Sequence, residues 1–549
     1  MLSLPSSSKQ FPQSKLLLFI VYGFISLFMF RNTQEAGLVF DFNGWAKVYN
    51  EHTFTDIFTS FGYPGLHQLG HLFFYSCYKI FGFNGTAWYL LFSLLHASTA
   101  VIAFSLVQDI GKYLFSSPVH KYLPLLASFL FLTSPFAVDV AVSKVCLHYL
   151  LSTLLIFTSL RCFIQYLSQA KQIFLLGSLL SFSLALFCLE IAYILPALVI
   201  YLLCYHTYQI KVVNMGKVLK ITLLFFGVLA SFLLLHKVLV GTFIGHYGSE
   251  VHTKFVLRDL LINFSYYLNN YLFFFDFWSY SYKEFQTEWM YRYGLLLFTG
   301  LLLLPLIAFV LKRKMRNRIG QLVLFAGLFF LALLPILNLY CVTLQPIEAD
   351  RYAYLASIFI YAAIAISFLS VSRWVQIPLA LVYMFFHFSF TFQNIEAFSE
   401  MGQVSRGLLD DFKWEDKEKV IILVQPENNN GARAFTTISR HGSEFAESLY
   451  LERGIDIRDK VDLIYEMNIN SVNDSVVVEV IDKKNIKVKV GSWGSWFWKH
   501  HLGAQSFKTK NYSTIVHDGL AFDLILNEPL KENEVMLYMN GNSWQVVNF

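Results

Sequence analysis

The chain has 549 residues, of which 56% are hydrophobic, 18% aromatic and 14% charged, and its mean hydropathy is +0.51. This composition excludes a soluble globular protein and indicates a chain that crosses a membrane many times. The net charge of +5 is modest and its basic residues mostly sit in short loops between apolar segments, so no nucleic-acid partner is expected. The six cysteines lie in the apolar part without a CxxC pair and are interpreted as core residues.

Apolar segments about 20 residues long predict about eleven transmembrane helices within residues 1–393. The expected spans are 16–30, 86–107, 121–138, 146–165, 172–189, 191–209, 218–240, 292–311, 319–340, 352–371 and 374–393. Every loop on the expected inner side carries a lysine or an arginine, which predicts a cytoplasmic N-terminus. The preferred location is a bacterial plasma (inner) membrane.

Two further segments are apolar but interrupted by polar residues. Residues 64–83 favour a helix lying in the membrane interface, and residues 255–275 favour a re-entrant or lateral helix in an outer loop. Whether either segment spans the membrane is left open. Residues 394–412 have a helical pattern that would extend the last span toward the C-terminal part.

The composition changes after the last span, which predicts a second domain over residues 394–549, outside the cytoplasm. An amphipathic helix is expected over 434–451. The apolar run at 419–426 predicts a buried strand. Apolar stretches between Asn, Gly, Asp and Lys turns predict further short strands at 475–481, 486–493, 521–526, 534–540 and 543–547. The predicted fold is therefore a multi-pass α-helical membrane domain followed by a β-rich α/β domain.

The first candidate functional residue is Asp41, in the stretch VFDFNGW (residues 39–45) just beyond the first span. An ionisable residue at a membrane boundary is a functional candidate. The alternative interpretation is an inert carboxylate in a solvated loop.

Two more carboxylates are expected at outer boundaries of the spans. Asp139 follows Thr133-Ser134-Pro135 at the end of a span, and its alternative interpretation is a side chain that only reaches the interface. Glu190 is the one charged residue in the stretch 184–198, which favours a position facing a cavity rather than lipid.

A cationic candidate, Arg351, lies at the mouth of a later span, where a guanidinium can hold a phosphate in a fork of donors. The alternative is a structural pair with Asp350. His67 and His71 have a spacing that could bind a metal, but no acidic pattern accompanies them, so no metal site is expected. The sequence contains no P-loop, dinucleotide glycine motif or serine nucleophile elbow.

Several segments, in this order, resemble the GT-C membrane glycosyltransferases that use polyprenyl-phosphate sugars. The similarity is to the membrane half of the tetratricopeptide-repeat O-mannosyltransferases and their bacterial relatives. The matching segments are Phe40-Asp41, Tyr63-Pro64 through Phe81-Gly82 with Trp88 and Leu94–Ala97, Ser134-Pro135 with Asp139–Val142, Cys188–Glu190 with Leu195-Pro196, and Ala349–Ser357. The chain differs at Phe42, where the family has a second acid, and no tetratricopeptide repeats follow.

The resemblance implies an enzyme that moves a sugar from a polyprenyl-phosphate donor to an extracytoplasmic acceptor by an inverting displacement. Asp41 would be the general base. The remaining candidates would bind the donor phosphate or sugar. Arg351 would meet the charge on the phosphate, with Lys144 or His148 assisting it, and Asp139 and Glu190 would orient the sugar or the cation. Asp350 and Tyr354 belong to the same matching segment as Arg351, Ala349–Ser357. No cofactor is expected, with a divalent cation left open, and the C-terminal domain would recognise the acceptor or cap the cavity.

Two other functions stay open. A transporter or lipid flippase would use the same charges without covalent chemistry, although the sequence lacks paired half-helices broken by Gly or Pro. A membrane-tethered binding or assembly protein would make the outer charges incidental.

Overall fold

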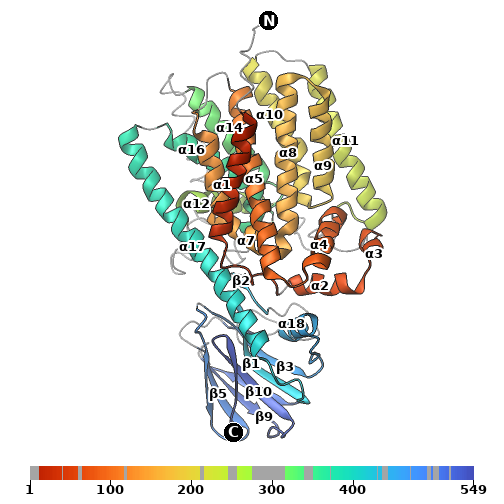
Figure 1. Cartoon of the computed structure of the whole chain (residues 1–549), viewed down its shortest axis with the longest axis vertical. Coiled ribbons are helices and arrows are strands. Elements are labelled where there is room, and N and C mark those ends of the chain that lie inside the picture. Colours follow the sequence, from red (N-terminus) through yellow and green to blue (C-terminus); the bar gives the residue numbers. More distant parts are fainter. Residues whose placement is uncertain are drawn as a thin grey trace.

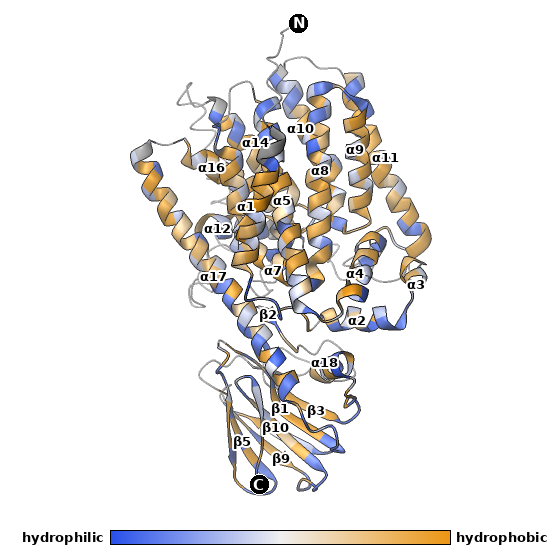
Figure 2. Ribbon diagram, viewed as in Figure 1, coloured by the Kyte–Doolittle hydropathy of each residue, from blue (hydrophilic) through white to orange (hydrophobic). Residues whose placement is uncertain are grey.

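The computed structural model has a bundle of long helices whose lower end adjoins a smaller domain of β-sheets (Figure 1). Hydrophobic residues dominate the bundle, whereas the strand domain mixes polar and apolar residues (Figure 2). The residues that the structure describes are 11–39, 41–59, 65–115, 120–210, 215–244, 256–274, 316–338, 350–370, 372–429, 431–435, 443–469, 471–490, 496–498, 506–517 and 521–549.

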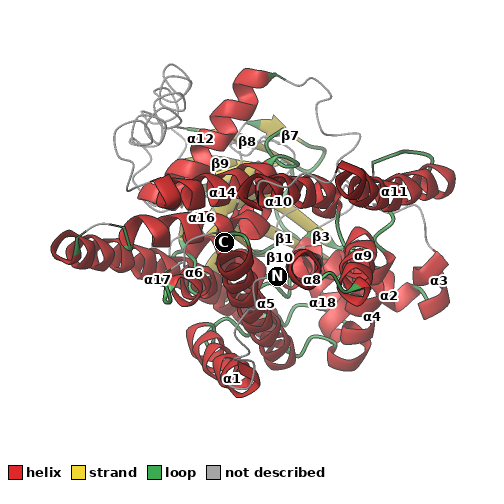
Figure 3. Cartoon of the chain, turned by 90° about the horizontal axis from the view of Figure 1, so that it is seen from above, coloured by secondary structure: helices red, strands yellow, loops and turns green. Residues whose placement is uncertain are grey.

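The helices of the bundle follow the predicted apolar segments. Those that correspond to predicted spans are α1 (Phe11–Met29), α5 (Gly85–Tyr113), α6 (Leu123–Leu132), α8 (Leu147–Gln169), α9 (Gln172–Leu186), α10 (Leu195–Ile210), α11 (Met215–Val240), α14 (Arg316–Leu333), α16 (Tyr354–Phe368) and α17 (Arg373–Asp411). Seen from above, α1, α11 and α17 lie at the periphery (Figure 3).

Among the described residues, six helices are long and apolar enough to cross a membrane, and a bent helix pair would make seven. The apolar stretches Lys15–Met29, Gln172–Leu186 and Arg318–Leu333 are shorter. The predicted span 292–311 lies outside the described residues. A helical membrane-type bundle is thus present, whereas the number eleven stays a prediction.

Short helices cover the lower end of the bundle. They are α2 (Asp41–Glu51), α3 (Phe54–Thr59) and α4 (Gln68–Phe81), and α4 is too short to span a bilayer. Phe42 anchors α2, because its ring is 1% exposed and packs against Phe74, Tyr78 and Trp88. Phe42 is therefore a core residue of this end of the bundle.

The segment predicted as one span over 121–138 is broken. Helix α6 ends at Leu132, and the turn η1 (Pro135–Ala137) leads into α7 (Val138–Val142), with a bend of 55° between the two parts. Pro135 explains the break, because a proline lacks the N–H that would continue the helical bonds. A second turn, η2 (Lys144–Cys146), then leads into α8.

Backbone carbonyls at the break are bonded by side chains of other helices. His96 of α5 bonds the Leu132 oxygen at 2.9 Å. On α17, Thr391 donates to the Thr133 oxygen at 2.7 Å, and Asn394 donates to the Pro135 oxygen at 3.0 Å. An unsatisfied buried polar group costs about 1–3 kcal/mol, so these bonds stabilise the bend.

The predicted helical connector 394–412 is confirmed, since α17 runs without interruption through 39 residues from the bundle into the C-terminal domain. Figure 2 shows that α17 is apolar along the bundle and becomes polar beside the sheets. The helix α12 (Leu257–Phe273) falls on the other ambiguous segment and is not among the candidate spans.

The C-terminal domain contains two sheets. One has the strand order β11-β10-β1-β3-β6, with β1 parallel to both β10 and β3, and the short β2 pairing with β1. Its strands are β1 (Lys419–Asn429), β2 (Ala432–Arg433), β3 (Val461–Asn468), β6 (Trp496–Trp498), β10 (Glu534–Asn540) and β11 (Ser543–Val546). The other has the order β4-β5-β9-β8-β7, from β4 (Val476–Val480), β5 (Asn485–Val490), β7 (Phe507–Lys508), β8 (Tyr512–Val516) and β9 (Ala521–Leu526).

All six predicted strands are present, but the predicted helix 434–451 starts too early. Residues 434–435 are a bend after β2, and the helix α18 (Glu444–Arg453) begins at Glu444. The strands β2, β3, β6, β7 and β8 were not predicted. The domain also shares its core with the lower end of the bundle, because Val138 and Val142 of α7 belong to the same buried cluster as the strands.

A close contact at this junction gives a stability prediction. Gly37 has a φ of +71°, and a Cβ there would lie 3.0 Å from Ser143 Cα and 3.2 Å from the Lys144 nitrogen. Gly37→Ala is therefore expected to lower the free energy of unfolding by roughly 1–3 kcal/mol, because a left-handed residue with a Cβ costs about 1–2 kcal/mol before any clash. Thermal unfolding of the full chain in detergent, followed by circular dichroism, measures this.

The matched control is Gly44→Ala on α2, since a Cβ at Gly44 would meet nothing within 4 Å. This variant should melt at the temperature of the native chain or slightly above it, because alanine favours a helix. Equal melting of the two variants would contradict the tight packing of Gly37.

Candidate functional site

Two neighbouring open cavities lie where the lower end of the bundle meets α2, α4 and the C-terminal domain. The first encloses about 450 Å³ of space between the protein atoms and the second about 410 Å³, with the open solvent at their mouths included, and Val145 lines both. Val145 belongs to the turn η2 after the helix break. The break therefore forms the wall between the cavities.

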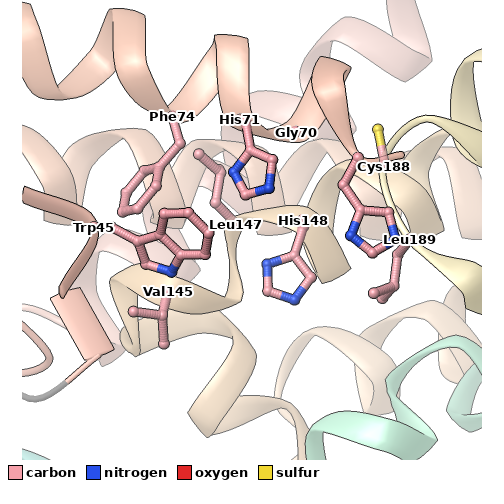
Figure 4. Close-up of a pocket in the computed structure, with 10 residues that line it drawn as sticks. Trp45, Gly70, His71, Phe74, Val145, Leu147, His148, Cys188 and Leu189 are labelled. Carbon is pink, nitrogen blue, oxygen red and sulfur yellow. The ribbon is translucent and has the colours of Figure 1, made fainter. Parts of the chain in front are cut away.

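Aromatic and imidazole rings from three helices converge on the first cavity, which Figure 4 shows in close-up. Trp45 comes from α2, His71 from α4 and His148 from α8. The ring centres of Trp45 and His71 are 4.5 Å apart, and the Tyr49 hydroxyl lies 3.3 Å from Nδ1 of His71. This wall offers apolar ring faces together with hydrogen-bonding nitrogens.

Glu190 lies beside the first cavity. Its Oε2 is 3.4 Å from Nε2 of His67, which lines the cavity, and both side chains are mostly buried, at 15% and 9% exposed. Glu190 was expected to face a cavity or a partner rather than lipid. It is not among the residues that line either cavity, but it contacts His67, which lines the first. In the described part of the chain, no group of three or more His, Cys, Asp and Glu residues has a geometry that could hold a metal ion.

Asp139 and Arg351 both line the second cavity. The Asp139 Oδ2 lies 4.0 Å from Nη1 of Arg351, and Ser143 donates a hydrogen bond to Oδ1 at 2.5 Å. Asp350 is buried near Tyr271 and Tyr361. The long ion pair thus joins the helix break to the turn η7 (Arg351–Ala353), which precedes α16.

Asp41 is the first residue of α2, which contacts both the turn η2 and the helix α18 of the C-terminal domain. Its charge acts on the Glu444 carboxyl and on the Cys146 thiol, and Cys146 in turn lies close to Asp139 and Arg351. Trp45 follows four residues later, on the same face of the helix. One helix therefore brings a carboxylate and an aromatic ring toward the wall between the cavities.

Five of the eight candidate residues are not among the lining residues of either cavity: Asp41, Glu190, Lys144, Asp350 and Tyr354. Two of these five, Lys144 and Tyr354, have fully buried side chains. The Lys144 side chain is 1% exposed, donates to the Val142 oxygen at 3.0 Å and lies 5.8 Å from the centre of the Phe92 ring. The hydroxyl of Tyr354 is 2.7 Å from Nδ1 of His96 inside the bundle. Both side chains stabilise the helices behind the site.

Sequence reasoning did not identify Trp45 or Arg433 as site residues. Arg433 belongs to β2 of the C-terminal domain and lines the second cavity beside Arg351. The four-residue spacing from Asp41 could have indicated Trp45 once 41–51 was recognised as a helix. No local pattern marks Arg433, because only the tertiary packing brings β2 to the bundle.

The carboxyl of Glu444 gives a pH prediction for the contact between α2 and α18. Burial raises the pKa of Glu444, the nearby charges of Asp41 and Glu447 add to this rise, and a hydrogen bond from Asn43 opposes it. Together these effects move the pKa from 4.5 to about 8. Because the folded-state pKa lies above the unfolded one, the contribution of Glu444 to stability is complete below about pH 4.5 and is lost as the pH rises to about 8.

Glu444→Gln is therefore expected to unfold at a higher temperature than the native chain at pH 8, by an amount that corresponds to at least about 1 kcal/mol. The difference should vanish near pH 4.5. Melting curves of the full chain across this pH range measure it. The control Glu479→Gln, at an exposed position of β4, should follow the native curve. If Glu444→Gln follows the native curve too, ionisation of the Glu444 carboxyl does not lower the stability of the folded chain.

Some of the motif residues fall outside the description: Phe40, Tyr63, Pro64 and Ala349 are not among the described residues. Comparison of the chain with protein-family models and with curated proteins finds no match. Charged and aromatic side chains of the helical part and of the C-terminal domain thus lie at two adjoining cavities.

Proposed function

We propose that the chain is an integral-membrane glycosyltransferase that moves a sugar from a polyprenyl-phosphate donor to an extracytoplasmic acceptor. The observation that carries the proposal is the pair of adjoining cavities at one end of the apolar bundle, one lined by Asp139 and Arg351 and the other by Trp45 and histidines. A donor whose lipid stays in the bilayer needs its phosphate and sugar sites at such a boundary.

In the proposed reaction, the Asp41 carboxylate takes the proton from an acceptor hydroxyl. The hydroxyl oxygen attacks the anomeric carbon while the bond between that carbon and the phosphate oxygen breaks. The lipid phosphate leaves with the bonding electrons, and the Arg351 guanidinium stabilises its charge. The anomeric configuration inverts in this single displacement.

The first cavity suits the sugar. The ring faces of Trp45 and His71 can cover the apolar C–H face of a pyranose, and the nitrogens of His148 can bond its hydroxyl groups. Glu190 orients the sugar through His67, because the Oε2 of Glu190 lies 3.4 Å from the Nε2 of His67. The acceptor is a protein, a lipid or a cell-envelope glycan, and we place the site on the periplasmic side of the plasma membrane.

One observation favours the alternative function of a transporter or lipid flippase. The helix break between α6 and α7 bends by 55°, and broken helices line the substrate sites of many transporters. A transporter would move a lipid-linked sugar across the bilayer and leave its glycosidic bond intact.

The test uses membranes that contain the full chain and a polyprenyl-phosphate sugar labelled in the sugar. Transfer of the label from the lipid fraction to a polar or protein fraction supports the glycosyltransferase. Movement of the intact labelled lipid between leaflets of proteoliposomes, with no loss of label from the lipid fraction, would instead support the transporter.

A further inference from the structure

The second cavity is built from both parts of the chain. The membrane half supplies the loop after α1, the helix break and the turn η7, whereas α17 and the hairpin of β1 and β2 supply the opposite side. The lining residues in the described part are Gly37, Val39, Asp139, Ser143, Val145, Arg351, Phe398, Gly431 and Arg433. The cavity therefore exists only when the C-terminal domain is docked.

The charges that line this cavity favour an anion. Two guanidinium groups, of Arg351 and Arg433, face a single carboxylate, that of Asp139. The carboxylate already accepts a hydrogen bond from Ser143 and pairs with Arg351. Guanidinium groups bind phosphate oxygens in a fork of parallel hydrogen bonds, so two of them at one cavity suit a phosphate.

One donor atom of the cavity is unsatisfied. The Nε of Arg351 is buried, and no hydrogen-bond partner for it exists among the described residues. A buried donor without a partner costs about 1–3 kcal/mol, and such a group in a native structure is commonly explained by a ligand or an ordered water molecule. An acceptor oxygen that enters the cavity would satisfy this atom.

The hairpin holds Arg433 in a defined position. Its strands pair Asn428 with Arg433, and the Gly431 N–H bonds the side-chain oxygen of Asn428 at 3.3 Å. Gly431 has a φ of +99°, which a residue without a Cβ adopts readily. The neighbouring Asn429 donates to Glu400 of α17 at 2.8 Å, so the hairpin is tied to the long helix.

The remaining lining residues connect the cavity to the apolar bundle. Val39, Val145 and Phe398 present hydrocarbon groups, and the cavity lies at the lower end of helices that are apolar enough to cross a membrane. A headgroup attached to a lipid chain meets both conditions, since the phosphate binds the arginines while the chain stays among the helices.

We infer that Arg433 is a second phosphate-binding residue and that the C-terminal domain completes the site for the phosphate group of a membrane lipid. The inference rests on the proposed function for the identity of this lipid as a sugar donor. It assigns the domain to donor binding, whereas the sequence alone suggested acceptor recognition or capping. Arg351 and Arg433 then hold the phosphate from opposite sides of the interface.

The experiment measures binding rather than transfer. The full chain in lipid nanodiscs is titrated with a labelled polyprenyl monophosphate, which carries no sugar, for the native chain and for the variants Arg433→Gln, Arg433→Lys and Lys489→Gln. Arg433→Gln is expected to weaken binding about 10- to 100-fold, because one charged fork is lost. Arg433→Lys should recover part of the affinity, since it keeps the charge and loses the fork.

Lys489→Gln removes a positive charge from an exposed position of β5 and should bind as the native chain does. Native affinity in Arg433→Gln, with the same melting temperature as the native chain, would overturn the inference. Inorganic phosphate serves as competitor. Competition only at concentrations far above those of the lipid supports a lipid headgroup, whereas competition at equal concentrations would overturn the lipid and indicate a free phosphate site.

The two proposals can fail separately. If Arg433→Gln loses affinity but no labelled sugar is transferred by the native chain, the phosphate site stands and the glycosyltransferase does not. If sugar transfer by Arg433→Gln has the native KM for the donor, the glycosyltransferase stands and the role of Arg433 is wrong.

Discussion

Replacing Arg351 by glutamine is expected to lower the rate of sugar transfer by roughly 10²–10³-fold, the loss typical of removing one preorganised donor to a developing negative charge. In the proposed reaction the charge appears on the lipid phosphate as the glycosidic bond breaks. Arg351 lies in the second cavity, 4.0 Å from Asp139, so its removal also leaves that carboxylate without its cationic partner. The labelled-donor assay, with saturating donor, measures the effect on kcat.

The control for this variant is Arg318→Gln, since Arg318 is an exposed arginine that bonds the Ser370 oxygen far from both cavities. It should keep native activity. Arg351→Gln that folds with the native melting temperature and transfers sugar at the native rate would show that another group meets the phosphate charge.

Replacing Asp41 by asparagine is expected to reduce transfer by roughly 10²–10⁴-fold, because a general base contributes about this factor in enzymes. The amide keeps the shape of the side chain but cannot accept the proton of the acceptor hydroxyl. The variant should also lose the acidic limb of the pH profile of kcat, which a purely structural role would leave in place.

A matched variant in the same region is Asp56→Asn. Asp56 lies on α3, and its carboxylate accepts hydrogen bonds from the Thr53 backbone and side chain at 2.8 and 2.7 Å. Its replacement should leave the rate of transfer unchanged. Survival of transfer in a folded Asp41→Asn protein would remove Asp41 from the chemistry and turn attention to Glu444, the carboxyl on which its charge acts.

Much of the fold follows from local patterns in the sequence. The length and hydropathy of the apolar segments predict the helices, and short apolar stretches between turn residues predict six of the strands. Strand β3 was missed because Asp462 and Glu466 interrupt its apolar residues. Glu466 is nevertheless buried, since Gln425 of β1 donates a hydrogen bond to it at 2.8 Å, and a partner that far along the chain leaves no local signal.

The candidate site was predictable in its outline only. Asp139 and Arg351 were expected at outer boundaries and do line one cavity. Lys144 was expected beside them, but its neighbour Val145 lines the cavities instead, because consecutive residues of a helical turn point in directions more than 90° apart. Spacing along the chain cannot give this direction without knowledge of where the turn begins.

Helix α17 fixes the position of the C-terminal domain relative to the helix break. It bonds the helix break through Thr391 and Asn394, and it bonds the C-terminal domain through Glu400 to Asn429 and through Asp411, which accepts from the Trp544 N–H at 2.7 Å. Each residue of an α-helix advances about 1.5 Å and turns about 100°. Inserting one residue between Asn394 and Glu400 would therefore rotate the whole strand domain about the helix axis by more than a quarter turn. An insertion of seven residues would nearly restore the direction of the domain but would displace it by about 10 Å along the axis. The separation of Arg351 and Arg433 is thus set by the number of residues in one helix. Natural variation in this protein should therefore tolerate substitutions on the exposed apolar side of α17 far better than any change in its length.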